Sequence, residues 1–237
     1  WGHDFRPSYR KLDELRKRFP KVPLMALTAS ATPAVIKDMR SLLNLNQAKN
    51  YVHSFERPNI AYKIWNTEDK FNTVVQLLKY HRGSSIVYCN TRKQTEHLAQ
   101  YINQNGYKAD FFHGGLLAEK KKEKLATWQE GGIPHIIATT AFGMGIDKAD
   151  VRLVIHTQLP DSIENFYQET GRAGRDGKPA CTYLLTYPGD AKALKSQFLD
   201  RIPSKLDIKE TYRDLCNFLQ IAYGEGKDQL YSLDLKR

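Results

Sequence analysis

Short apolar runs alternate along the chain with stretches in which apolar residues recur every three or four positions. The runs are rich in valine, isoleucine, leucine and aromatic residues without clean alternation, which is typical of strands buried in a parallel sheet. We expect strands at residues 22–27, 84–89, 107–112, 134–139, 151–156 and 180–187. Helical spacing occupies residues 70–81, 92–106, 117–132 and 162–171. This alternation predicts an α/β domain whose parallel sheet carries helices on both faces.

Two breaks in the pattern divide the chain. Residues 53–62 place Arg57-Pro58-Asn59 between two ordered patterns, which indicates a linker. Near residues 201–210 the alternation stops and one helical pattern follows. We therefore expect a main domain over residues 55–200, preceded by a stub over 1–54 and followed by a helical tail over 201–237. The stub has too few elements to bury a core alone.

Helix caps and apolar spacing add detail to both flanking pieces. In the stub, Thr32 precedes Pro33 at a first helical position, which predicts a helix N-cap. In the tail, apolar side chains at helical spacing are expected to fill the interior. These tail residues are Ile208, Tyr212, Leu215, Phe218 and Leu219.

Composition narrows the class of protein. The 237 residues are 41% hydrophobic, contain no apolar run long enough to cross a bilayer, and open without a signal sequence. We expect a cytoplasmic protein, associated with the nucleoid if bacterial, and no membrane partner. The three cysteines are scattered and never spaced as CxxC, so neither a disulfide framework nor a zinc knuckle is expected.

The net charge of +10 favours a polyanionic partner, chiefly nucleic acid. A solvated basic helix face, such as residues 118–128, would raise the charge without any such partner. The charge alone therefore leaves both possibilities open.

Two arginines stand among glycines in the segment QETGRAGRDGKP, residues 168–179. The planar guanidinium groups of Arg172 and Arg175 match phosphate oxygens, and glycine lets the backbone turn sharply and approach a ligand. Such arginines can stabilise the negative charge on a phosphoryl group while it is transferred, which is the role of an arginine finger. The alternative is a surface loop in which they pair with Glu169 and Asp176.

Polar residues and glycines also follow the predicted strands at their carboxyl ends, where open α/β sheets bind ligands. A helix begins directly after residues 84–89, and its backbone amides favour phosphate. The residues at these strand ends are Thr28 and Ser30, then Asn90, Thr91 and Arg92, then His113 and Gly114, and finally Thr139, Gly143, Gly145 and Asp147.

The order of these motifs resembles the helicases of superfamily 2. They run LTASAT, IVYCNTRKQTE, HGG, ATTAFGMGID and QETGRAGRDG. The opening stretch WGHDFRPSY, residues 1–9, is similar to the aromatic-rich loop of the RecQ family of DNA helicases, which follows the Walker B box there. The resemblance covers about residues 1–200. It implies a second RecA-like motor domain over 55–200, preceded by part of the first in 1–54.

The resemblance also implies a role for each motif. Arg172, Arg175 and Gln168 would face a triphosphate held by the other RecA-like domain, with Gly143, Gly145 and Asp147 on the nucleotide side. Single-stranded DNA would lie along the other strand ends, and the aromatic-rich loop would sense it. The DNA-side residues are Trp1, His3, Phe5, Arg6, Thr28, Ser30, Asn90, Thr91, Arg92, His113, Gly114 and Thr139.

No metal site is expected within the chain. His3 and His113 have no second ligand at metal spacing. Many RecQ-like enzymes carry a four-cysteine zinc module after the motor, but only Cys216 lies beyond residue 200, so no zinc is expected.

The sequence contains neither a GxxxxGK[ST] phosphate loop nor a DExH box. In a RecQ-like enzyme both lie upstream of WGHDFRP. The resemblance thus implies a parent 3′-to-5′ helicase that acts on single-stranded and duplex DNA. ATP and Mg²⁺ would be bound mainly by an N-terminal RecA-like half, and this chain alone would be inactive. Two alternatives stay open: an ATP-independent module that binds single-stranded nucleic acid, and part of an RNA-directed superfamily 2 motor.

Overall fold

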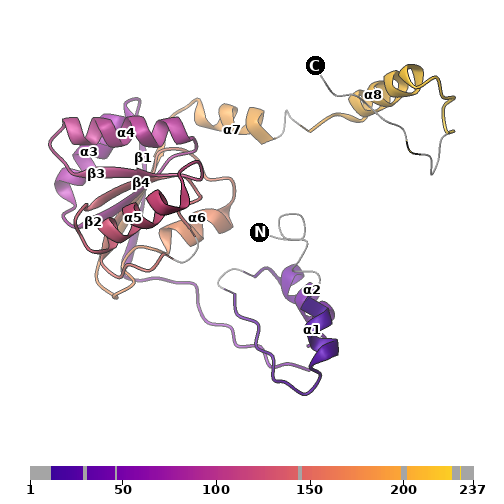
Figure 1. The fold of residues 1–237 in the computed structure, drawn as a ribbon. Helices are drawn as coiled ribbons and strands as arrows, with labels where there is room; N and C mark the ends of the chain where they lie inside the picture. Colours follow the sequence, from indigo (N-terminus) through magenta and orange to yellow (C-terminus); the bar gives the residue numbers. More distant parts are fainter. Residues whose placement is uncertain are drawn as a thin grey trace. The chain divides into compact units, whose positions relative to one another are not determined.

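The computed structural model describes residues 12–28, 31–45, 47–143, 146–198, 202–225 and 230. The chain divides into two compact units, residues 1–186 and 187–237 (Figure 1). The first unit contains the sheet and every predicted motif that the structure describes.

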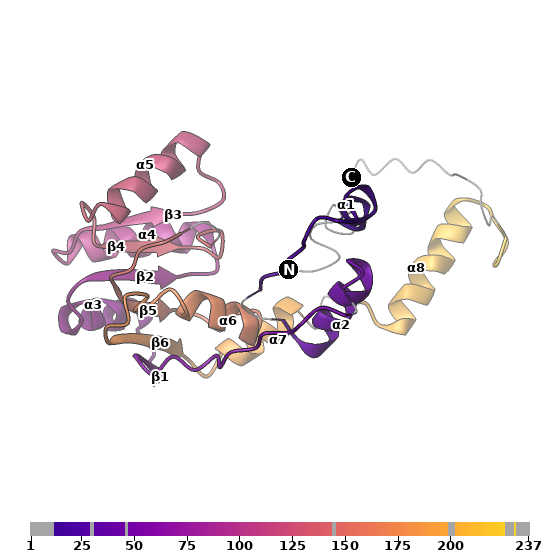
Figure 2. The same ribbon diagram turned by 90° about the horizontal axis from the view of Figure 1, so that it is seen from below.

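Six parallel strands form one sheet in the order β1-β6-β5-β2-β4-β3 (Figure 2). Five of them fall on apolar runs of the sequence, and the predicted α/β fold is confirmed. The strands are β1 Ile60–Asn66, β2 Ser84–Tyr88, β3 Ala109–Phe112, β4 His135–Ala138, β5 Val151–His156 and β6 Ala180–Thr186.

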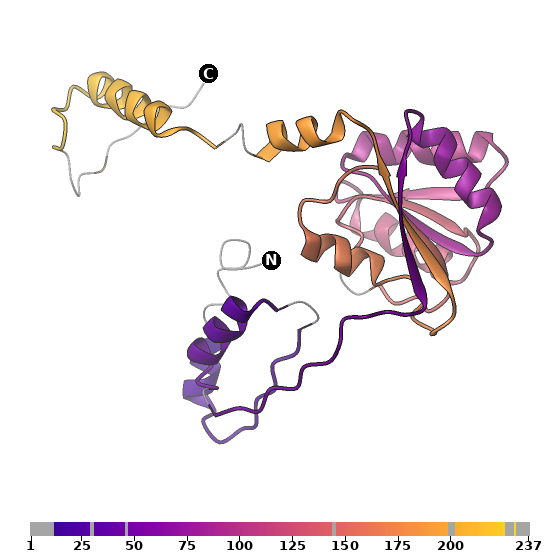
Figure 3. The same ribbon diagram turned by 180° about the vertical axis from the view of Figure 1, so that it is seen from behind.

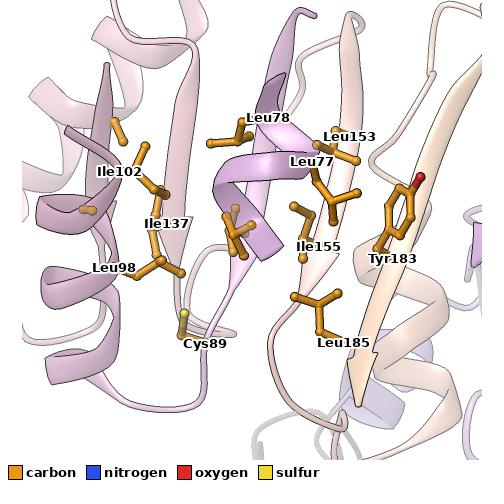
Figure 4. Close-up of a cluster of buried hydrophobic side chains, with 14 residues drawn as sticks. Leu77, Leu78, Cys89, Leu98, Ile102, Ile137, Leu153, Ile155, Tyr183 and Leu185 are labelled. Carbon is orange, nitrogen blue, oxygen red and sulfur yellow. The ribbon is translucent and has the colours of Figure 1, made fainter. Parts of the chain in front are cut away.

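Helices α3 (Lys70–Tyr80) and α4 (Arg92–Gln104) cover one face of this sheet. Their apolar side chains pack on the strand residues that point to that face, because successive strand side chains alternate between the two faces. Figure 4 shows this layer, in which Leu98 and Ile102 of α4 lie beside Ile137 of β4. Leu77 of α3 lies near Leu153 and Ile155 of β5 in the same cluster.

Helices α5 (Ala118–Gln129) and α6 (Ile163–Thr170) lie on the opposite face. Trp128 is the buried residue of α5, and it packs edge-on against Phe142 with ring centroids 5.3 Å apart. Strand residues such as Ile86 and Tyr88 supply the other side of this core. The segment after β4 is therefore held against the same face as α6.

Residues 53–62 were predicted to be a linker, but the structure places β1 at Ile60–Asn66, and the prediction is wrong from residue 60 onward. β1 and β6 lie together at one edge of the sheet (Figure 3). Their register sets Ile60 opposite Ala180. Only Ile60 of this edge strand is buried, and Lys63 interrupts its apolar residues, so the sequence does not show the continuous apolar run of a central strand. Pairing with β6 makes it a strand.

The stub contains helices α1 (Leu12–Arg18) and α2 (Pro33–Leu42). Thr32 caps α2 as predicted, because its side chain accepts a hydrogen bond from the Val35 backbone N–H at 3.3 Å. The strand predicted at residues 22–27 is wrong, since this extended segment pairs with no strand in the part of the chain that the structure describes. Met25 and Leu27 in it are more than 80% exposed.

The second unit holds α7 (Asp190–Phe198) and α8 (Lys205–Phe218), and α8 begins with a capping box between Ser204 and Asp207. The helical tail is present, but the predicted interior is not. Ile208, Tyr212, Leu215 and Phe218 are exposed, Leu219 is half-buried, and Cys216 is the buried residue of α8. Among the described residues, no helix is both long and apolar enough to cross a membrane.

Candidate functional site

The two motif arginines lie on the loop that follows α6. Arg175 is exposed, and its Nη1 donates hydrogen bonds to the Ile146 carbonyl at 3.0 Å and to Asp147 Oδ1 at 2.7 Å. Asp147 was expected to meet a nucleotide or the arginines, and the structure places it on Arg175. The Asp147 side chain is 85% exposed, so the pair is weak and open to exchange with another anion.

Arg172 is half-buried beside Tyr88 and Gly143. Burial raises the pKa of the Tyr88 phenol, and the positive charge of Arg172 acts in the opposite direction. Tyr88 donates its hydroxyl hydrogen to the Phe142 carbonyl at 3.1 Å. The Nε of Arg172 is buried and has no hydrogen-bond partner among the residues described. This N–H of the guanidinium is therefore left unsatisfied and is covered by the surrounding residues.

The two carboxylates beside the arginines have other partners. Glu169 Oε2 lies 2.8 Å from His156 Nε2 in a buried pair. Asp176 Oδ1 accepts from Arg152 Nη2 at 2.6 Å, and the Arg152 guanidinium holds the pKa of Asp176 below its usual value. The pairing of Glu169 and Asp176 with Arg172 and Arg175, which the surface-loop alternative assumed, is therefore wrong.

A small pocket lies between the carboxyl ends of β2 and β5. The sheet order changes direction between these two strands. β4 and β3 lie on the far side of β2, whereas β6 and β1 lie on the far side of β5. Parallel α/β sheets bind ligands at such a switch point. The pocket is lined by Tyr88, Cys89, Asn90, Thr140, His156, Gln158, Pro160, Asp161, Asn165 and Glu169.

The sequence predictions missed most of this pocket. Gln158, Asp161 and Asn165 follow β5 in the stretch HTQLPDSIEN, where the position after a predicted strand could have drawn attention to them. His156 stacks on the Tyr88 ring with centroids 5.1 Å apart. Burial and the nearby charge of Glu169 raise the pKa of Asp161.

Six of the predicted DNA-side residues meet at one edge of the sheet. Strands β2, β4 and β3 are neighbours, with Tyr88 and Phe112 both opposite Ala138, so their carboxyl ends lie side by side. The backbone N–H of Thr139 donates to the Phe112 carbonyl at 3.1 Å and ties two of these ends together. The six residues are Asn90, Thr91, Arg92, His113, Gly114 and Thr139.

This edge combines exposed polar groups with a helix N-terminus. Asn90, Thr91 and Arg92 are exposed, and the Thr91 side chain caps α4. Arg92 lies over Gly115, where an added Cβ would stand 2.8 Å from its Nη1. His113 is buried, with its Nε2 2.9 Å from Glu96 Oε1. The positive helix end and the arginine favour a phosphate backbone along this edge.

Several predicted residues cannot be placed. Trp1, His3, Phe5, Arg6, Ser30 and Gly145 lie outside the described residues. Thr28 is exposed at the end of the extended stub segment, and Gln168 is half-buried in the last turn of α6.

Within the described ranges, no cluster of three or more histidine, cysteine, aspartate or glutamate side chains could hold a metal ion.

Gly174 gives the first testable prediction. It has φ +54°, and a Cβ there would lie 2.5 Å from Asn59 Nδ2 and 2.7 Å from the Lys178 carbonyl oxygen. Gly177 has φ +78° but nothing within 4 Å of an added Cβ. Gly177→Ala should cost about 1–2 kcal/mol, the cost of a left-handed alanine. Gly174→Ala should cost more, because backbone must also move. Urea unfolding of both variants tests this, and equal losses would contradict it.

Comparison with known proteins places this geometry in a family. Residues 69–177 match the helicase conserved C-terminal domain. The probable ATP-dependent DNA helicase RecS of Bacillus subtilis is 46% identical over 194 residues, which are 80% of this chain and 39% of that protein. The ATP-dependent DNA helicase RecQ of Pasteurella multocida is 42% identical over 205 residues, 85% of this chain and 32% of that protein. The chain thus spans about a third of the length of these relatives.

Solved structures agree on the fold. The Escherichia coli DEAD-box protein SrmB matches with a TM-score of 0.54 and 25% identity over 62% of this chain and 89% of that one. Saccharomyces cerevisiae Dbp5 bound to RNA and ADP BeF3 matches with a TM-score of 0.65 and 20% identity, over 92% of this chain and 60% of that one. The sheet is therefore RecA-like, and the chain belongs to the RecQ family of superfamily 2 helicases.

Proposed function

We propose that this chain is part of an ATP-dependent DNA helicase in which residues 55–200 form the second RecA-like motor domain and residues 1–54 belong to the first. The observation that carries the proposal is the loop after α6. It holds Arg172 half-buried, with an Nε that has no partner among the residues that the structure describes, while the neighbouring acids Glu169 and Asp176 are bound elsewhere. Glu169 and Asp176 therefore do not neutralise the charges of Arg172 and Arg175, and this supports a phosphate as their partner.

The chemistry assigned to the loop is stabilisation of charge. ATP and Mg²⁺ would be held by an N-terminal RecA-like half that carries a phosphate loop, because these 237 residues contain none. Arg172 would donate hydrogen bonds to phosphate oxygens as negative charge builds on them during hydrolysis. Arg175 would exchange its exposed contact with Asp147 for the same anion. The cleft between the two RecA-like domains would be lined by Gln168 and Gly143. Gln168 lies in the last turn of α6, and Gly143 lies beside Arg172.

Single-stranded DNA would lie along the carboxyl edge of β2, β4 and β3. Its backbone would meet the N-terminus of α4, the Arg92 guanidinium and the backbone around Gly114. A net charge of +10 supports a polyanionic partner. The relatives at 42–46% identity are named DNA helicases, and this favours DNA over RNA. Duplex DNA would be the substrate that is unwound, and the location would be cytoplasmic, at the nucleoid if the protein is bacterial.

The test joins this chain to a RecQ-type N-terminal half with its phosphate loop and DExH box. ATP hydrolysis is measured with single-stranded DNA, with single-stranded RNA of the same sequence, and without nucleic acid. We expect turnover that DNA stimulates more than RNA, and none from the isolated 237-residue chain. Stronger stimulation by RNA would favour the RNA-directed motor. Binding of DNA without any hydrolysis in the joined protein would favour the ATP-independent module.

A further inference from the structure

The segment just before β1 is bonded to the arginine loop through a second guanidinium. Arg57 Nη1 donates to the Gly171 carbonyl at 3.3 Å, and its Nη2 donates to the carbonyls of Ala173 at 3.1 Å and Gly174 at 3.0 Å. Arg57 is half-buried, so these bonds are partly shielded from water. The carbonyls that it holds lie on both sides of Arg172.

Asn59 holds the far side of the same loop. Its Nδ2 donates to the Gly174 carbonyl at 2.7 Å and to the Lys178 carbonyl at 3.0 Å, while its own carbonyl accepts from Ala180 N–H at 2.9 Å. The last bond continues directly into the pairing of β1 with β6. The sheet therefore anchors Asn59, and Asn59 anchors the loop.

The loop needs such support because its own backbone is permissive. Three glycines stand among residues 171–177, and Gly174 and Gly177 have positive φ. Glycine loses more conformational freedom on ordering than any other residue, so this stretch has little intrinsic stiffness. A side chain aimed at a reacting phosphate must still be held closely, since a displacement of 1 Å can cost roughly a hundred-fold in rate.

We infer that Arg57 and Asn59 are positioning residues that fix the loop carrying Arg172 and Arg175, so that their loss lowers catalytic turnover more than nucleotide binding. The inference rests on the proposed function of that loop. Contacts of the same segment with α6 support it, because the Tyr167 hydroxyl donates to the Phe55 carbonyl at 2.7 Å and the two rings meet edge-on. The segment thus holds both the loop and the helix before it.

The kinetic test uses the joined protein with saturating single-stranded DNA. Arg57→Ala should lower kcat by roughly a hundred-fold, while KM for ATP changes little because the N-terminal half binds most of the nucleotide. Arg57→Lys should recover part of the loss, since one ammonium can reach some of the three carbonyls. Asn59→Asp, which keeps the size but sets a carboxylate against two carbonyls, should behave like Arg57→Ala.

Arg40→Ala is the matched control. Arg40 also donates to a backbone carbonyl, that of Ala48 at 2.8 Å, but in the stub. It should leave kcat unchanged. A fall in kcat for Arg57→Ala no larger than that for Arg40→Ala would overturn the inference. So would a rise in KM that accounts for the whole loss.

A second readout uses the 237-residue chain itself and needs no ATP hydrolysis. In nuclear magnetic resonance spectra, the Gly174 backbone N–H and the Arg172 Nε–H should shift in Arg57→Ala and Asn59→Asp but not in Arg40→Ala.

If Arg172→Ala stops turnover while Arg57→Ala does not, the proposed function stands and the inference falls. If Arg172→Ala leaves turnover intact, the proposed function falls. The effect on turnover that we infer then falls with it. The spectra still decide whether Arg57 and Asn59 hold the loop, and unshifted signals overturn that part as well.

Discussion

Replacing Arg172 by alanine in the joined protein is expected to lower kcat for ATP hydrolysis by about a thousand-fold or more, the contribution typical of an arginine finger. The reason is positional. Arg172 is the half-buried arginine of the loop, it lies beside Gly143, and its Nε lacks a partner in the described part of the chain. The unsatisfied Nε–H and the positive charge could therefore respond to charge that develops on a phosphate during the reaction.

Lysine and the neighbouring arginine provide the controls for this change. Arg172→Lys keeps the charge but loses the planar fork, so little activity should return. Arg175→Ala should also reduce turnover, whereas Asp147→Asn should keep most of it, because it removes only the negative charge of an exposed partner of Arg175. Steady-state hydrolysis with single-stranded DNA measures all four variants. Turnover within a few-fold of wild type for Arg172→Ala would mean that the loop is only a charged turn.

The second large effect is expected on stability, from Trp128→Ala. Trp128 is fully buried and is the one buried residue of α5, whose outer positions are mostly charged. Removing a buried tryptophan side chain costs about 3–5 kcal/mol in free energy of unfolding, from lost burial and the cavity left behind. Trp128 packs on the ring of Phe142. The Phe142 carbonyl accepts a hydrogen bond from the Tyr88 hydroxyl, and its backbone N–H donates to the Thr139 carbonyl. The cavity should therefore loosen the segment after β4 as well.

Urea unfolding of the 237-residue chain, followed by circular dichroism, measures this loss. Leu117→Ala is the matched control, since Leu117 stands at the start of the same helix with 76% of its surface exposed and should change stability by less than about 0.5 kcal/mol. Trp128→Phe should fall between the two. A loss for Trp128→Ala close to that for Leu117→Ala would mean that α5 contributes little to the core.

Local chemistry explains what could be predicted from the sequence. Central strands such as β2 and β5 are buried on both faces, so their composition is apolar whatever lies beside them. Thr32 caps α2 through a bond within its own turn. Arg172 and Arg175 can be recognised from the sequence because two arginines among glycines suit the binding of a phosphate. In each case the residues that matter are neighbours in the chain.

Tertiary structure decided the features that depend on distant partners. β1 is a strand because β6 supplies its hydrogen bonds, and residues 22–27 are not one because no partner strand stands beside them in the described chain. Glu169 binds His156 and Asp176 binds Arg152, so only the fold showed that these acids leave the two arginines to other anions.

Arg57 illustrates the same limit most clearly. It reads as part of a linker, yet it bonds a loop more than a hundred residues away. The sequence alone determined the fold class, the order of the motifs and the arginine pair, since each is written in contiguous residues. The three-dimensional packing determined how that pair is held, because a hydrogen bond across the fold leaves no periodicity in the chain.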